Sequence, residues 1–379
     1  MSPHPRPEAV HRYGRRRAAL AAALLAALVT TGCGVRLESP PVAEPVPDSL
    51  EVVRRTAVSD ALLVAERAEG ALEQVPRGRE RLVAELTRIV VDSESQAAEL
   101  GGEYDSGLAT DDPADTPEAS AAEDPTTVPD VVASLDDAAA RSRTAAGTTT
   151  DGPLARLLAS VGAAQTVSAT RLAALADVAG PDVVDPRIPE PVGQGRAAQP
   201  ASPAPEESDG TAGTDEGDEA QDASAEDPAD EATPPEGLTV DQLETLVVSE
   251  DATGYALRLR AALADGTRRE RLLAREEAHL ARATAWARLA GIQDTAQDPR
   301  RVAYEVPRRT ELGDGALVRT LENDLATDYA TLVAGTAPGS RGTVVDLLVD
   351  AALALDDWDA EPSPFPGLPE QQDEDEGED

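Results

Sequence analysis

The amino-acid sequence predicts an all-α protein made of two four-helix bundles that are joined by a disordered acidic linker. Ala, Leu, Arg and Glu, which favour helices, dominate the chain outside its acidic segments. Apolar residues recur every three to four positions, and the period-two alternation that indicates strands is missing. In each half the second connection between predicted helices is long, whereas the first and third are short. Two bundles of the same plan are therefore expected.

The first bundle is predicted over residues 48–180. Its apolar stripes begin, in chain order, at Leu50, Leu82, Val131 and Leu154. Short breaks at 76–78 and 147–152 contain Gly and Pro, which end helices. The connection between the second and third stripes holds an acidic insert at 101–129, which we expect to be disordered.

The second bundle is predicted over residues 237–360. Thr239 and Gln242 have the spacing of a capping box, which satisfies free N–H groups at a helix start. The apolar stripes begin at Leu243, Leu272, Leu317 and Val344. The long connection lies at 291–315. Bundles with one long crossover between helices 2 and 3 are of the ferritin-like type, and an up-down bundle with an insertion is the alternative for either half.

Two more segments are too acidic to fold alone. Residues 181–236 form the predicted linker, where 16 acidic residues face only Arg187 and Arg196. Residues 361–379 form a predicted tail that ends in QQDEDEGED. Low hydrophobicity combined with like charge does not offset the entropy cost of ordering, so both segments are expected to be disordered.

The first 32 residues have the pattern of a lipoprotein signal peptide. Three consecutive arginines precede an apolar stretch at 18–29, which is too short to cross a bilayer. Small residues then lead into Cys33, as in the bacterial lipobox, although Thr30 stands where Leu is usual. We expect cleavage before Cys33, lipidation of that residue with palmitate among its acyl chains, and a spacer at 33–47. The protein would then be exported and anchored on the outer face of the cytoplasmic membrane, by either general or twin-arginine secretion.

The charge of the chain restricts its partners. The formal net charge is −39, and the signal peptide removes five Arg but only one Glu, so the mature chain is more negative still. Such a surface repels nucleic acid and anionic lipid headgroups, so nucleic acid is excluded as a partner. The membrane is expected to be a partner only through the lipid on Cys33, with an envelope protein as a possible second partner.

The second bundle resembles a domain of unknown function, classed as ferritin-like, that occurs in exported actinobacterial proteins. The strings that carry the resemblance are LVVSEDATGYAL at 246–257, AREEAHLARATAW at 274–286, RVAYEVP at 301–307 and LENDLATDYATLV at 321–333. In the first bundle, GPLARLLASVGAAQ at 152–165 is similar to the helical part that precedes this domain in lipoproteins. The resemblance implies a fold and an envelope location, and it implies no established activity.

Four residues of the second bundle could bind a metal ion. A ferritin-like di-iron centre takes a Glu from two helices and a Glu-x-x-His from each of the other two. Glu250, the pair Glu276 and His279, and Glu322 match part of this pattern. The fourth helix supplies no His, and its acids fall off the apolar stripe, so one Glu-x-x-His is missing. A single metal ion is one interpretation, and a buried Glu–His–Glu cluster or pairing with Arg275 and Arg282 is the preferred one.

No complete catalytic constellation can be assembled from this sequence. Once the signal peptide is removed, His279 is the sole imidazole and Cys33 the sole, acylated thiol. The leading hypothesis is therefore a non-enzymatic envelope lipoprotein, without cofactor, that binds a protein or a small ligand. A metal-binding or redox protein that uses Glu250, Glu276, His279 and Glu322 is the alternative. A transporter's solute-binding lipoprotein is disfavoured because no strands are predicted.

Overall fold

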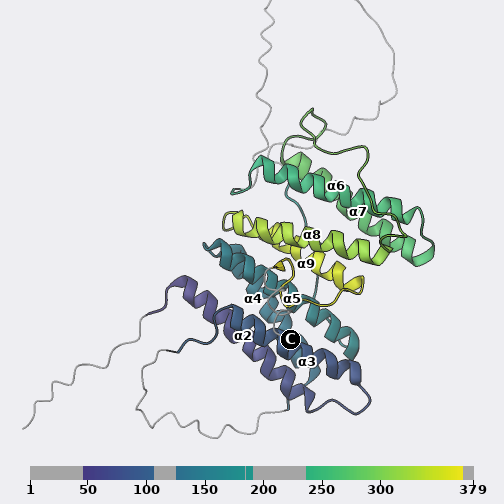
Figure 1. Ribbon diagram of the computed structural model, residues 1–379. Helices are drawn as coiled ribbons and strands as arrows, with labels where there is room; N and C mark the ends of the chain where they lie inside the picture. Colours follow the sequence, from purple (N-terminus) through teal and green to yellow (C-terminus); the bar gives the residue numbers. More distant parts are fainter. Residues whose placement is uncertain (1–45, 106–124, 184, 191–235, 370–379) are drawn as a thin grey trace, which may run out of the picture. The chain divides into compact units, whose positions relative to one another are not determined.

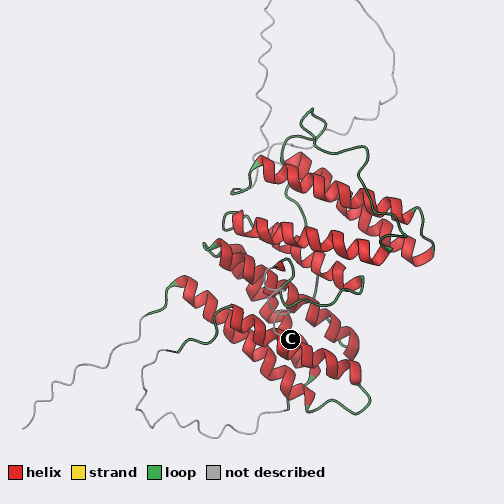
Figure 2. Cartoon of the chain, in the orientation of Figure 1, coloured by secondary structure: helices red, strands yellow, loops and turns green. Residues whose placement is uncertain are grey.

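A computed structural model describes residues 46–105, 125–183, 185–190 and 236–369. This part of the chain contains eight α-helices and no strand (Figure 2), which confirms the predicted all-α class. All eight helices belong to one compact unit, Pro47–Tyr104 with Asp115–Asp379. The other unit, Met1–Val46 with Asp105–Ala114, lies almost wholly outside the described residues, as do the predicted signal peptide and Cys33.

The first helix group contains four helices, labelled as in Figure 1. They are α2 (Ser49–Leu72), α3 (Glu80–Glu99), α4 (Val128–Thr148) and α5 (Gly152–Ala176). Asp48 and Asp151 accept hydrogen bonds from the first turns of α2 and α5, so each of these two helices begins at a capping side chain. The connection between α3 and α4 is the long one, as the sequence predicts.

The second helix group repeats this plan. Its helices are α6 (Val240–Ala261), α7 (Gly266–Leu289), α8 (Asp314–Gly335) and α9 (Gly342–Asp357). The predicted capping box is present, because Thr239 accepts from the Gln242 N–H and the Gln242 side chain accepts from the Thr239 N–H. The long connection again follows the second helix of the group. Two helix groups with the predicted pattern of connections are thus confirmed.

The two groups share one hydrophobic core. α5 packs against α3 and α4 and also against α8 and α9. Its sequence is rich in small residues, and nearly every side chain from Leu158 to Ala169 is buried. A helix that is apolar or small on all sides can be enclosed on all sides. One cluster of buried residues therefore runs from Ala57 and Leu158 in the first group to Trp286 and Leu348 in the second.

The C-terminal segment differs from the disordered tail predicted from residue 361. Phe365 and Leu368 are buried in the shared core, each at most 3% exposed. Gly367 adopts φ +78°, and a Cβ at this position would lie 2.5 Å from the Ala326 carbonyl oxygen. Only glycine allows this approach of the segment to α8. Residues 361–369 therefore form a C-terminal strap, and the rest of the predicted tail lies outside the described residues.

The predicted linker is described only at its ends. Residues 185–190 lie against the second group, where the Arg187 carbonyl oxygen accepts a 3.1 Å hydrogen bond from the Thr343 hydroxyl. At the other end, the Glu236 carbonyl oxygen accepts a 3.0 Å hydrogen bond from the Ala337 N–H. One end is thus held by the first turn of α9 and the other by the loop before it, and most of the linker and of the acidic insert lies outside the described residues.

Candidate functional site

Three of the four candidate ligands meet inside the second helix group. Glu250 on α6, His279 on α7 and Glu322 on α8 are each 0% exposed. All three lie on the apolar stripes of their helices, and this position directs their side chains inward. The sequence pattern therefore correctly placed these residues toward one another.

His279 is at the centre of this cluster. Its Nδ1 lies 2.7 Å from Glu250 Oε2, and its Nε2 lies 3.1 Å from Glu322 Oε1. A neutral imidazole has only one N–H donor, whereas the imidazolium has two. Because both ring nitrogens face carboxylate oxygens, the geometry fits the protonated ring.

Arginines extend the cluster toward α9. The Arg275 guanidinium donates to both oxygens of Glu322, at 2.6 and 2.7 Å, in a bidentate pair. Its Nη1 also donates to Asp350 Oδ2 at 2.7 Å, and the Arg282 Nη2 donates to the same oxygen at 2.6 Å. With the ring protonated, three carboxylates face three cations, so the cluster is balanced in charge.

The pKa shifts follow from this arrangement. Burial lowers the pKa of His279, but the carboxylates of Glu322 and Glu250 outweigh burial and raise it above its ordinary value. Burial raises the pKa of Glu322, but His279 and Arg275 lower it to about 2. Both shifts favour the charged forms, in agreement with the hydrogen-bond geometry of the ring.

Glu276, the fourth candidate, does not join this cluster. Its Oε1 accepts from the Arg258 Nε at 2.8 Å and from the Arg258 Nη2 at 2.5 Å. The Arg258 side chain is 62% exposed, whereas Glu276 is buried, so this pair lies at the edge of the helix group. The i, i+3 spacing puts Glu276 and His279 near one face of α7, but an arginine on α6 holds the carboxylate away from the imidazole.

Sequence reasoning missed two members of the cluster. Tyr329 is fully buried, and its hydroxyl donates to Glu250 Oε1. Its position seven residues after Glu322 on α8 puts both on one helix face, and this spacing could have identified it. Asp350 was expected to fall off the stripe of α9, yet it contacts Arg275 and Arg282 because these two long side chains reach it. Of the two arginines expected to pair with the candidate residues, Arg275 pairs with Glu322, whereas Arg282 pairs with Asp350.

A metal ion does not fit the donors as they lie. The oxygens of Glu250 and Glu322 already face N–H or O–H groups of Tyr329, His279 and Arg275. Within the described residues, no group of three or more His, Cys, Asp or Glu side chains has the arrangement that a metal ion requires. A metal would need Arg275 to leave Glu322 and His279 to lose a proton.

A groove runs along the outer side of this cluster, between α7 and α9. Its volume is about 590 Å³, within the range of small-molecule sites. Arg271, Arg275 and Arg282 line it together with Trp358 and four alanines of α7. The Arg271 guanidinium stacks on the Trp358 ring at 4.2 Å. Asp185, Asp350 and Asp357 also line the groove, which thus combines an apolar floor with walls that carry both charges.

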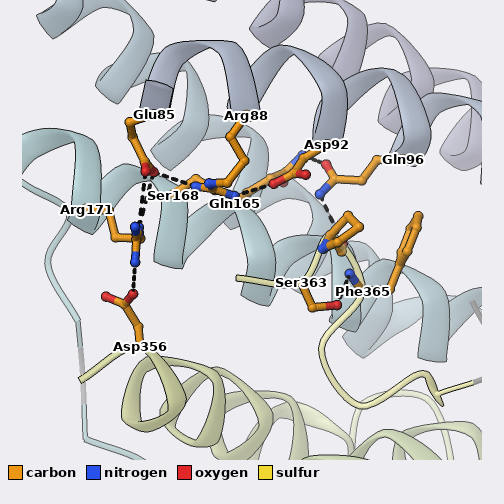
Figure 3. Close-up of polar contacts among 11 residues, drawn as sticks. Glu85, Arg88, Asp92, Gln96, Gln165, Ser168, Arg171, Asp356, Ser363 and Phe365 are labelled. Carbon is orange, nitrogen blue, oxygen red and sulfur yellow. Dashed lines mark hydrogen bonds and ion pairs between the residues drawn. The ribbon is translucent and has the colours of Figure 1, made fainter. Parts of the chain in front are cut away.

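A second polar cluster joins α3 and α5 to α9 and the C-terminal strap (Figure 3). Glu85 is only 4% exposed, and Arg171 lies between it and Asp356, with Arg171 Nε 3.2 Å from Glu85 Oε2. Nearby, Gln96 donates to the Pro364 carbonyl oxygen at 3.2 Å. No local pattern predicts this cluster, because its partners are far apart in the chain. It ties the two helix groups together.

Comparisons with known proteins identify one domain. Residues 243–370 match a family described as a domain of unknown function (DUF4439). The matched residues include all of the candidate cluster and the C-terminal strap. No curated protein and no solved structure matches the chain. Among the helices of the described residues, none combines the length and the apolar character needed to cross a membrane.

Proposed function

We propose that this chain, with its domain of unknown function at 243–370, is an exported lipoprotein that binds a protein or a small ligand without catalysing a reaction. Its location outside the cytoplasm is inferred from the signal-peptide pattern that ends at Cys33. The long connection between α7 and α8 supports a ferritin-like plan for the second helix group.

One observation carries the non-catalytic part of the proposal: the buried cluster is closed. Each carboxylate of Glu250, Glu322 and Asp350 is already held by an internal donor. Glu250, His279 and Glu322 are 0% exposed, so the groups that could act as acid, base or ligand do not face solvent. A catalytic acid or base must come within hydrogen-bond distance of a substrate, whereas these groups are hydrogen-bonded to one another.

The groove between α7 and α9 supports the binding part of the proposal. Its alanine floor lets a ligand or a partner side chain approach the helix closely, and Trp358 and the arginines at its walls are residue types that dominate binding energies. A photo-crosslinking residue in place of Ala281, which is exposed in the groove, tests this surface in intact cells. We expect a reproducible adduct there and none from the same substitution at the exposed Thr87 on α3.

Metal analysis separates this proposal from the alternative of a metal-binding or redox protein. That alternative keeps one favourable observation, the convergence of Glu250, His279 and Glu322. The full mature chain should contain far less than one equivalent of iron, manganese or zinc. One equivalent of any of these metals that is lost in His279→Ala would overturn the non-catalytic proposal.

The lipid anchor is tested separately. Cells grown with an alkyne-bearing palmitate analogue should label the wild-type protein, which should fractionate with membranes. Cys33→Ser should lose the label and leave the membrane fraction, because a lipid chain supplies the anchoring energy. A labelled or membrane-bound Cys33→Ser protein would contradict the proposed anchor.

A further inference from the structure

The residues before α9 in the second helix group hold the turn between α4 and α5 of the first group. Arg341, which is 2% exposed, donates to the carbonyl oxygens of Ala146, at 3.3 Å, and of Thr149. The last carbonyls of a helix have no partner within it, and the last turn of α4 contains no basic side chain. The Gly339 N–H adds a 2.7 Å hydrogen bond to the Gly147 carbonyl oxygen. The second group therefore satisfies main-chain groups that the first group leaves open.

A glycine lets the two groups approach each other closely beside this turn. Gly152 is the first residue of α5, and a Cβ at this position would lie 2.5 Å from the Ala334 carbonyl oxygen of α8. Non-bonded heavy atoms pack at roughly 3.5–4.0 Å, so this approach requires glycine. A Cβ at Gly147, at the end of α4, would meet no atom within 4 Å. The fit between the groups is therefore sensitive to the side chain at residue 152.

Further contacts extend this interface along α5. The helix packs against α8 and α9 as well as against α3 and α4. Ser160 on α5 donates at 2.8 Å to the Pro366 carbonyl oxygen of the C-terminal strap. Arg143 on α4 forms a 2.6 Å ion pair with Asp346 on α9. The interface thus combines apolar packing with hydrogen bonds and an ion pair, as stable interfaces between separate proteins do.

The covalent connection between the two groups contributes none of these contacts. Its described ends lie close together, because Pro189, Glu190 and Leu238 form parts of the wall of one pocket. A break in the chain within 191–235 leaves every contact of the described residues in place. The covalent linkage raises the concentration of each group near the other and adds no affinity of its own.

We propose that the second helix group carries a binding surface for a separate polypeptide, and that the first helix group is the partner that fits it. Arg341 recognises the partner through the carbonyl oxygens of its helical turn, and α8 recognises it through the close approach at Gly152. A chain that is cut in the linker therefore stays assembled. With the proposed anchor on Cys33, proteolysis of the linker leaves the second group held at the membrane by the first.

The domain at 243–370 depends on this partner for a complete core. Phe365 and Leu368 of its C-terminal strap lie in the same cluster of buried residues as Leu158 and Val161 of α5. None of the interface contacts named above involves a residue that lines the groove between α7 and α9. The inference therefore goes beyond the proposed binding role and does not rest on it.

A cut in the linker of the full chain from residue 33 onward tests the proposal. Cys33→Ser removes the lipid site, and a protease recognition sequence inserted between Gly210 and Thr211 allows the folded chain to be cut. Size-exclusion chromatography of the cut protein at about 1 μM should show both fragments in one peak, at the position of the uncut protein. The midpoint of thermal unfolding should rise with protein concentration for the cut protein only. Separate peaks for the two fragments would overturn the proposal.

Two glycine variants of the cut protein form a matched pair. Gly152→Ala places a methyl group against the Ala334 carbonyl oxygen and should weaken the association of the fragments at least about tenfold. Gly147→Ala adds the same group in open space and should leave the association unchanged. Circular dichroism of the uncut variants confirms that both fold. Equal dissociation constants for the two variants would show that the groups do not meet at residue 152.

Arg341 allows a test that adds no bulk to the interface. Arg341→Met removes the hydrogen bonds to the turn between α4 and α5 and should weaken the association at least about tenfold. Arg309→Met removes a guanidinium whose contacts, with Leu263 and Asp314, stay within the second group, and it should leave the association unchanged. Wild-type affinity in the Arg341→Met protein would contradict the proposed recognition of the turn.

Discussion

At the scale of single residues, His279 explains why the candidate metal site is instead an ion-pair cluster. Its two ring nitrogens face Glu250 and Glu322, and Arg275 takes both oxygens of Glu322. A buried charge without a partner is costly, whereas a balanced set of ion pairs is tolerated. The positive charge that a metal would supply is therefore supplied by the imidazolium and two guanidinium groups.

The stability that His279 contributes should depend on pH with a defined sign. Its folded pKa is raised above 6.5, so the contribution is complete below pH 6.5 and is lost as the pH rises through the folded pKa. We expect the difference in unfolding free energy between wild type and His279→Gln to shrink as the pH rises above 6.5. Urea unfolding across this range measures it, and a difference that grows with pH would contradict the assignment.

The stability that Glu322 contributes should depend on pH with the opposite sign. Its pKa is lowered from 4.5 to about 2, so its contribution is complete above pH 4.5 and is lost as the pH falls toward 2. The difference in unfolding free energy between wild type and Glu322→Gln should therefore shrink over this acidic range. Urea titrations of both proteins measure this effect, and a constant difference would show that Glu322 carries no charge-dependent stability.

Breaking the buried pair should be far more harmful than breaking a surface pair. Arg275→Met leaves Glu322 buried with one cation fewer, and we expect a loss of about 3–5 kcal/mol of unfolding free energy. Arg308→Met breaks the pair with Glu311, in which both side chains are exposed, and should cost about 0–1 kcal/mol. Denaturant unfolding compares the two, and equal losses would show that the buried cluster does not stabilise the fold.

The sequence predicted the members of this cluster better than their pairing. Glu250 and His279 lie on the predicted apolar stripes and Glu322 lies beside one, so helical periodicity indicated that these side chains would converge. The partner of Glu276 could not be predicted in this way. The i, i+3 spacing relates residues within one helix, whereas Glu276 lies on α7 and its partner Arg258 lies on α6. Its spacing on α8 could have identified Tyr329 as a member of the cluster. The membership of Asp350 depends on how far the Arg275 and Arg282 side chains extend, which the sequence does not show.

At the scale of elements, the C-terminal strap is the main departure from the sequence prediction. Phe365 and Leu368 are its only large apolar residues besides proline, and they lie between prolines beside a strongly acidic end. No helical or strand period can form from so few residues, so composition alone indicated disorder. Burial of this short segment depends on a core surface built by α3, α5 and α8, which no local pattern describes.

Removing the buried ring of the strap should destabilise the protein. Phe365→Ala should cost about 3–5 kcal/mol of unfolding free energy, because the ring is 3% exposed within the shared core. Pro369→Ala changes an exposed position of the same strap and serves as the control. Chemical denaturation measures both, and an unaffected Phe365→Ala protein would show that the strap does not contribute to the core.

At the scale of the whole molecule, the two predicted groups are present, and a shared core joins them in addition to a smaller cluster of buried residues within each group. The sequence predicted each group from its own stripes, and it predicted the order of short and long connections. The sequence could not predict which helices of the second group contact the first. α5 is buried on several sides, so it has no single apolar face that would indicate its neighbours.

His279 is the sole imidazole downstream of the predicted signal peptide, which allows the most direct test of the central claim, that the buried cluster is a set of ion pairs and not a metal centre. The other two histidines, His4 and His11, lie in the predicted signal peptide. Proton–nitrogen NMR of the ¹⁵N-labelled mature chain therefore reports on His279 without ambiguity. Because both ring nitrogens face carboxylates, we expect both to be protonated at pH 7 and the ring to titrate above pH 6.5. A ring that is neutral at pH 7, titrates near pH 6.5 or shows a metal-bound nitrogen would contradict it.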